Sequence, residues 1–276
     1  AASRGDRAWP VQYIEPVQPR RRPSATTTAT ADAARSRGWW PRSGGLPRPC
    51  VLCSQWCTAG FCSDCNQRFL QPDVPRCPRC ALPGPADQPC GSCLRQPPPF
   101  SHCSTLADYG FPWDRLITRF KFQQQPELAR LLADALADML ERQPQMATAP
   151  RPRPDWVLPV PLSPQRLAER GYNQAWELAR HLAARRACAA RAGWLLRLRD
   201  TPHQVGLGRA AREANLRGAM WVPPEGQRGI AGRQLALVDD VMTTGVTAAA
   251  ATRALLAAGA AGVQVWVLAR TPPPGE

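Results

Sequence analysis

The stretch LALVDDVMTTGVT, residues 235–247, decides the fold. Four apolar residues lead into two adjacent carboxylates, Asp239 and Asp240, and a threonine-rich segment with one glycine follows. We expect a buried strand over 235–238 with the aspartates at its C-terminal edge, a turn over 242–247, and then an alanine-rich helix. Ligands bind at this edge of open α/β sheets. Adjacent like charges repel, so the pair favours a bound ligand.

The turn carries groups that suit a phosphate. Free backbone N–H groups and the positive end of the following helix favour an anion. Thr243, Thr244 and Thr247 add hydroxyl donors, Gly245 allows close approach of the backbone, and Val246 lies between them. The aspartates are acceptors for neighbouring hydroxyl groups, and a phosphate beside a vicinal diol describes a ribose 5-phosphate. The alternative is an ordinary strand-to-helix turn.

Strand and helix patterns alternate from residue 104 onward. Apolar runs predict strands at 104–111, 155–162, 194–200, 219–222, 235–241 and 263–269. Amphipathic or alanine-rich patterns predict helices at 112–122, 126–143, 173–187 and 244–259. This alternation predicts an α/β domain over 104–272 with a mostly parallel sheet. Residues 1–47, rich in Arg, Pro, Ser and Thr, are expected to be a disordered extension.

Residues 48–98 form a cysteine-rich module with four CxxC pairs. The pairs are Cys50 with Cys53, Cys62 with Cys65, Cys77 with Cys80, and Cys90 with Cys93. Two such pairs complete a tetrahedral four-thiolate zinc site, so we expect two structural zinc ions in a double zinc ribbon. The spacing leaves sequential and interleaved pairing open. A redox role is the alternative, but four copies favour a structural one.

The net charge of +14 favours an anionic partner such as nucleic acid. Lys121 is the only lysine beside many arginines, a skew that is also typical of a G+C-rich genome, so solvated surface arginines are the alternative. A lone lysine suggests a phosphate contact or a buried ion pair. No uninterrupted apolar run is long enough to span a membrane, and the first residues lack an apolar signal core. The sequence therefore predicts a cytoplasmic protein, in which cysteines bind metal rather than form disulfides.

The segment VDDVMTTGVT, 238–247, resembles the phosphoribosyl diphosphate signature of type I phosphoribosyltransferases. Together with the cysteine module, it resembles the ComF family of competence-associated proteins, including the ComFC and GntX types. Three further stretches are similar to segments of that family, at 109–122, 158–179 and 200–222. The resemblance covers about residues 50–270.

The resemblance implies a core parallel sheet of the type I phosphoribosyltransferase kind. Asp239 and Asp240 would contact the ribose hydroxyls and act in catalysis, and Thr243–Thr247 would hold the 5-phosphate. Magnesium would bind the diphosphate, as its preference for phosphate oxygens implies. Arg170 and Asn173 follow the strand at 155–162, so they are candidates for diphosphate contacts together with Lys121; a plain helix start is the alternative. In such folds a mobile loop covers the ligand, and the residues at the corresponding place are Thr201, Gln204, Arg209, Arg212 and Asn215. The alternative for these five residues is a solvated face.

Three functions remain open at this point. The first is binding of phosphoribosyl diphosphate with Mg2+ in support of natural competence and DNA uptake, with the zinc module binding nucleic acid or partner proteins. The second is a non-catalytic adaptor that binds single-stranded DNA. The third is a nucleotide-salvage phosphoribosyltransferase. The acceptor, and whether turnover occurs, are not set by these motifs.

Overall fold

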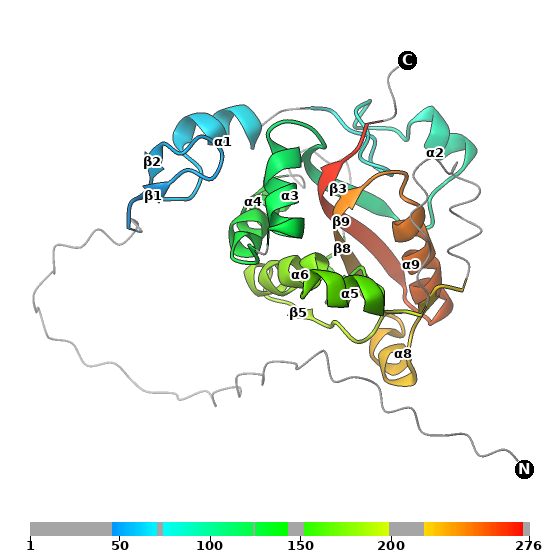
Figure 1. Cartoon of the computed structure of the whole chain (residues 1–276). Coiled ribbons are helices and arrows are strands. Elements are labelled where there is room, and N and C mark those ends of the chain that lie inside the picture. Colours follow the sequence, from blue (N-terminus) through cyan, green and yellow to red (C-terminus); the bar gives the residue numbers. More distant parts are fainter. Residues whose placement is uncertain (1–45, 71–73, 124, 143–151, 199–217, 273–276) are drawn as a thin grey trace, which may run out of the picture. The chain divides into compact units, whose positions relative to one another are not determined.

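A five-stranded parallel sheet forms the centre of the protein in the computed structural model (Figure 1). Its strands, in spatial order, are β3 (His102–Asp108), β9 (Gly262–Arg270), β8 (Gln234–Met242), β4 (Trp156–Pro159) and β5 (Ala189–Ala190). Each neighbouring pair is parallel. The prediction of an α/β fold with a mostly parallel sheet is confirmed.

The structure describes residues 46–70, 74–123, 125–142, 152–198 and 218–272. Most of the predicted extension at 1–47 and nearly all of the predicted loop around Thr201–Asn215 therefore lie outside the described residues. None of the helices in the described ranges has the length and apolar character that crossing a lipid bilayer requires.

Helices cover both faces of the sheet (Figure 1). The helices on one face are α3 (Trp113–Phe122), α4 (Leu128–Arg142) and α6 (Gln174–Arg185), and those on the other are α8 (Pro224–Ile230) and α9 (Val246–Ala257). Strand β8 shows how the sequence divides between the two faces. Ala236 and Val238 belong to the core under α3, α4 and α6, whereas Leu235 and Leu237 belong to the core under α9. This is the period-two alternation of a strand that is buried on both sides.

Three elements differ from the sequence prediction. Strand β8 is one residue longer at each end than the strand predicted at 235–241, because β9 pairs with it from Gln234 to Met242. Strand β4 ends at Pro159, three residues before the end of the strand predicted at 155–162. The run at 194–200 gives only β6 (Leu196–Arg197), which pairs with β7 (Met220–Trp221) outside the main sheet. The sequence patterns missed the short strand β5 and the helices α5 (Pro164–Arg170) and α8.

The cysteine-rich part contains two similar units. In each unit a short helix begins directly after the third cysteine, α1 (Ser63–Phe69) after Cys62 and α2 (Gly91–Arg95) after Cys90. The first unit also contains a two-stranded antiparallel hairpin of β1 (Arg48–Pro49) and β2 (Trp56–Cys57). Each helix start places two cysteines of a CxxC pair on one short turn, where both sulfurs can face the same point.

Candidate functional site

The two aspartates lie where β8 extends beyond the end of its neighbour β4. Pairing between β4 and β8 ends at Pro159 and Val238, whereas pairing between β8 and β9 continues to Met242 and Arg270. Asp239 and Asp240 therefore lie at an opening on the β4 side of the sheet. This is the edge at which open α/β sheets bind ligands.

Asp240 forms an ion pair with the lone lysine. The Lys121 ammonium, near the end of α3, lies 2.9 Å from the Asp240 carboxylate. Both side chains are largely buried, with 19% of Lys121 and 9% of Asp240 exposed. Of the two roles expected for Lys121, the structure shows the buried ion pair. The phosphate contact remains a proposal.

Asp239 has an unusually high affinity for a proton. Burial and the neighbouring Asp240 charge raise the pKa of Asp239 to about 7, against the opposing effects of Lys121, the Asp240 backbone N–H and Arg170. That N–H donates to the Asp239 carboxylate over 2.9 Å. A bound cation or hydroxyl donors would stabilise the charged form, so this carboxylate is suited to receive a ligand.

Arg170 and Asn173 lie at the turn between α5 and α6. The Arg170 guanidinium donates to Gln174 Oε1 over 3.0 Å and lies over the Phe122 ring. Asn173 is 3% exposed and begins α6: its side-chain oxygen accepts from the N–H groups of Ala175 and Trp176, and its amide donates to a backbone carbonyl after β4. Its side chain is thus engaged in starting the helix, the alternative weighed for this segment. Arg170 is close enough to affect Asp239.

The threonine loop, residues 242–247, joins β8 to α9. Thr243 and Thr244 are exposed, and Val246 and Met242 are buried. Gly245 has φ +78°, a conformation that favours glycine, and no side chain caps the helix that begins at Val246. The first backbone N–H groups of α9 therefore have no side-chain acceptor at the N-cap residue, which is Gly245. The loop is open, as a phosphate site requires.

Arg270 is a buried residue of this site that the sequence patterns did not single out. Its guanidinium donates to the carbonyls of Met242 (3.0 Å), Thr271 (2.8 Å) and Thr243, and its Nε donates to the Cys80 carbonyl over 2.9 Å. Only 6% of the residue is exposed. The one available signal was an arginine directly after the apolar run 263–269, where a charge is costly unless it has partners.

A cavity of about 580 Å³ borders the other side of the threonine loop. Its lining includes residues 242–246, Arg253 of α9, Cys80, Cys93 and the segment Pro97–Phe100. Neither aspartate lines it, nor do Lys121 or Arg170. The threonine loop thus adjoins the acidic pair through β8 and the second cysteine unit through this cavity.

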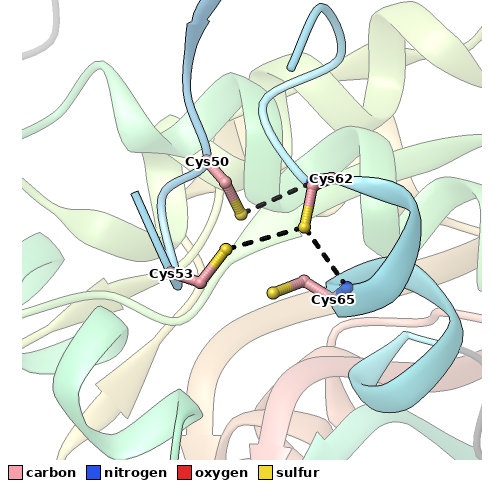
Figure 2. A group of neighbouring side chains, drawn as sticks. All are labelled: Cys50, Cys53, Cys62 and Cys65. Carbon is pink, nitrogen blue, oxygen red and sulfur yellow. Dashed lines mark hydrogen bonds between the residues drawn. The ribbon is translucent and has the colours of Figure 1, made fainter. Parts of the chain in front are cut away.

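The first cysteine cluster gathers Cys50, Cys53, Cys62 and Cys65 (Figure 2). Their sulfur atoms lie within 4.8 Å of one another. The Cys62 N–H donates to the Cys50 sulfur over 3.4 Å, and the Cys65 N–H to the Cys62 sulfur over 3.5 Å. Backbone N–H groups that point at sulfur stabilise thiolates, which are the form that binds metal.

The second cluster repeats this geometry with Cys77, Cys80, Cys90 and Cys93. The Cys90 N–H donates to the Cys77 sulfur over 3.2 Å, matching the bond from Cys62 to Cys50. The sulfurs of Cys80 and Cys90 are 3.7 Å apart, and those of Cys53 and Cys62 are 3.6 Å apart. The structure thus groups the cysteines sequentially, one of the two pairings that the spacing left open.

The thiols within each cluster have opposite pKa shifts. Burial raises the pKa of Cys50, but N–H donors from Cys53, Cys62 and Leu52 outweigh it and lower the value to about 6. The pKa of Cys77 falls to about 7 for the same reasons, while burial and neighbouring sulfurs raise that of Cys93. Four clustered thiols cannot all ionise without a cation. Each cluster therefore fits a metal that binds four thiolates, such as zinc.

Comparison with known proteins finds bacterial relatives that match most of this chain. It is 37% identical over 235 residues to the DNA utilization protein YhgH of Salmonella typhi, covering 82% of this chain and 98% of the relative. It is 36% identical over 217 residues to competence protein F of Haemophilus influenzae, covering 76% of this chain and 90% of the relative. The chain belongs to the ComF family. No protein-family model matches this ComF-family chain.

Solved structures similar to this chain include two enzymes whose names contain the word phosphoribosyl. Glutamine phosphoribosylpyrophosphate amidotransferase of B. subtilis has 19% identity and a TM-score of 0.35, covering 54% of this chain and 30% of the other. Adenine phosphoribosyltransferase of Saccharomyces cerevisiae has 18% identity and a TM-score of 0.33, covering 53% and 72%. Both likenesses are weak, so the description of the fold rests on its own strand order and pairing.

Proposed function

We propose that this protein binds phosphoribosyl diphosphate at the edge formed by β8, the threonine loop and α9. The single observation that carries the proposal is an open, glycine-containing loop at a helix start, directly after two carboxylates on one strand. The helix start and the exposed threonines suit a phosphate, and the carboxylates suit sugar hydroxyls. A ribose 5-phosphate has a phosphate and neighbouring hydroxyl groups in one molecule.

Each residue has a distinct role in this proposal. The N–H groups and hydroxyls of the threonine loop, with Thr243, Thr244 and Thr247, hold the 5-phosphate, while Gly245 and Val246 bring the backbone close to it. Asp239 and Asp240 accept hydrogen bonds from the ribose hydroxyls. Lys121 and Arg170 supply positive charge for the diphosphate, and Asn173 holds the start of α6 beside them. Asp240 would have to share Lys121 with the ligand, because the two are paired without it.

Two kinds of metal ion complete the proposal. Mg2+ would be held by diphosphate oxygens and water, and would neutralise charge on the diphosphate. One Zn2+ in each cysteine cluster would stabilise its short unit. Zinc binding requires reduced thiols in both clusters, so the proposal includes a reducing compartment such as the cytoplasm.

Titration calorimetry with phosphoribosyl diphosphate, with and without Mg2+, tests the proposal. The double variant Asp239→Asn with Asp240→Asn should lose saturable binding. The matched control is Asp134→Asn with Asp138→Asn on α4, which changes the charge equally in surface ion pairs. This control should bind as the unmodified protein does. Equal affinity of both double variants would refute the assignment of the acidic pair.

The biological setting is proposed from the relatives. Proteins named for DNA utilization and competence suggest a role in DNA uptake or use. Catalysis is a separate question: release of diphosphate with a particular base would indicate nucleotide salvage, and failure with every common base would count against it. Transfer would proceed through a positively charged sugar, which nearby carboxylates stabilise.

A second candidate function is binding of single-stranded DNA, favoured by the relatives' names and the net charge of +14. In that case the threonine loop would hold a phosphate of the strand. Fluorescence anisotropy with a short labelled oligonucleotide at several salt concentrations tests it. Affinity that falls steeply with salt, together with no saturable binding of phosphoribosyl diphosphate, would favour this function over the first.

A further inference from the structure

Arg270 connects the threonine loop to the second cysteine cluster. It lies at the C-terminal end of β9, and its hydrogen bonds reach in two directions. Two of them hold Met242 and Thr243, at the start of the threonine loop. Another holds the carbonyl of Cys80, itself a member of the second cluster. One buried side chain thus fixes both segments to the same point.

The charge of Arg270 points to the same connection. Among the described residues, no carboxylate lies within ion-pair distance of this guanidinium, and its hydrogen bonds go to neutral carbonyls. The guanidinium is nevertheless buried, with only 6% of the residue exposed, and its Nε lies 2.9 Å from the carbonyl oxygen of Cys80. Four thiolates with one Zn2+ carry a net charge of about −2. A loaded second cluster would therefore supply the anion that a buried guanidinium requires.

Other contacts fix the second cluster to the same edge of the sheet. Arg76 forms an ion pair of 2.6 Å with Asp108, the last residue of β3, and also donates to the Ala81 carbonyl. The Cys103 N–H of β3 donates to the Pro78 carbonyl over 3.3 Å. The segment Pro75–Ala81 is thus held along β3, by Cys103 near the start of the strand and Asp108 at its end, and at the end of β9 by Arg270. A movement of the cluster would therefore displace a partner of Arg270.

The first cluster is fixed elsewhere. Arg119 of α3 donates to the Val51 carbonyl over 3.1 Å, and Arg142 of α4 donates to the Leu70 carbonyl over 3.2 Å. Neither contact involves the threonine loop, and no member of the first cluster lines the cavity beside it. The two clusters share their internal geometry but contact different parts of the α/β domain. The first cluster can therefore serve as the control for experiments on the second.

We propose that the second cysteine cluster, when it holds its metal, keeps the threonine loop in its ligand-binding conformation through Arg270. Arg270 is then a positioning residue, and loss of the metal loosens the loop without changing any residue that touches the ligand. The proposal makes metal supply a regulator of the site. It rests on the proposed function only for the identity of the ligand.

The test compares Cys93→Ser with Cys65→Ser, which remove the corresponding buried sulfur from the second and first clusters. Each variant should retain one zinc per chain by metal analysis. Hydrogen exchange is then measured without ligand at the amides of 242–247. Cys93→Ser should speed this exchange by roughly tenfold or more, whereas Cys65→Ser should leave it unchanged. Equal effects of the two variants, or no effect of either, would overturn the proposal.

Arg270→Lys is the second variant, in case Cys93→Ser fails to fold. It keeps the charge but cannot donate to four carbonyls from one planar group. It should retain both zinc ions, speed exchange in the threonine loop and weaken binding of phosphoribosyl diphosphate. Unchanged exchange in Arg270→Lys would also overturn the proposal. Because exchange is measured without ligand, failure of phosphoribosyl diphosphate to bind the unmodified protein would contradict the proposed function alone.

Discussion

At the scale of single residues, the acidic pair has two members in different states. Asp240 is neutralised by Lys121, whereas Asp239 has a pKa of about 7 and no ion-pair partner of its own among the described residues. The repulsion noted in the sequence is thus partly relieved by a lysine that lies far away in the chain. The remaining repulsion acts on Asp239, the carboxylate whose charge a bound ligand would stabilise.

Lys121→Met should destabilise the protein by roughly 3 kcal/mol, because it leaves the buried Asp240 carboxylate without its cation. Chemical denaturation at neutral pH measures the free energy of unfolding. Arg130→Gln is the control: its ion pair with Asp134 is long, at 4.0 Å, and exposed. That variant should cost less than about 0.5 kcal/mol. Similar losses from both would show that the Lys121 pair is not special.

Asp239→Asn should stabilise the protein at pH 8, by about 1 to 3 kcal/mol. The folded pKa of about 7 lies above the ordinary value of about 3.9. The folded state therefore holds the proton more tightly, and its stability falls as pH rises from about 4 to 7. The difference between variant and unmodified protein should vanish near pH 4. Urea denaturation across this range checks the prediction, with Asp138→Asn at an exposed position of α4 as the control.

At the scale of elements, the sequence patterns predicted those strands and helices that depend on short-range periodicity. The apolar run before Asp239 and the alanine-rich helix after Gly245 were placed correctly because strand and helix periodicity are short-range signals. The predicted strand at 235–241 was one residue short at each end, since the full length of β8 depends on pairing with β9. A buried ion pair was one of the two roles expected for Lys121, but its partner Asp240 could not be predicted, because that contact requires the packing of α3 beside β8.

Gly245→Ala should cost about 1 kcal/mol of stability and weaken phosphate binding, because an added Cβ disfavours φ +78°. Space is not the obstacle, as the nearest atom to that Cβ would be the Met242 sulfur at 3.5 Å. Gly110→Ala is the matched control. It has no positive φ, and its Cβ would meet nothing within 4 Å. A Gly245→Ala protein with full stability and affinity would show that the turn adapts to a side chain.

At the scale of the whole molecule, the eleven cysteines divide into eight that belong to clusters and three that do not. The three are Cys57, Cys103 and Cys188, of which Cys103 is buried. The sequence alone identified all eight cluster members by their CxxC spacing. It could not choose the pairing, because pairing depends on how each unit turns back on itself.

Thiol titration should therefore proceed in two stages. Before chelation, at most three thiols per chain should react, and after a strong zinc chelator eight more should follow. Metal analysis of the untreated protein should give two zinc ions per chain. Immediate reaction of all eleven thiols in a protein that contains zinc would show that the metal lies outside these clusters.

Strand β3 lies at one end of the sheet, and its outer side is not paired with another strand of that sheet. The Cys103 N–H on this strand is instead taken by Pro78, between the first two cysteines of the second cluster. An uncovered strand edge is a template for pairing with another chain. A protein stripped of zinc is therefore expected to self-associate through β3, so that zinc starvation and aggregation occur together.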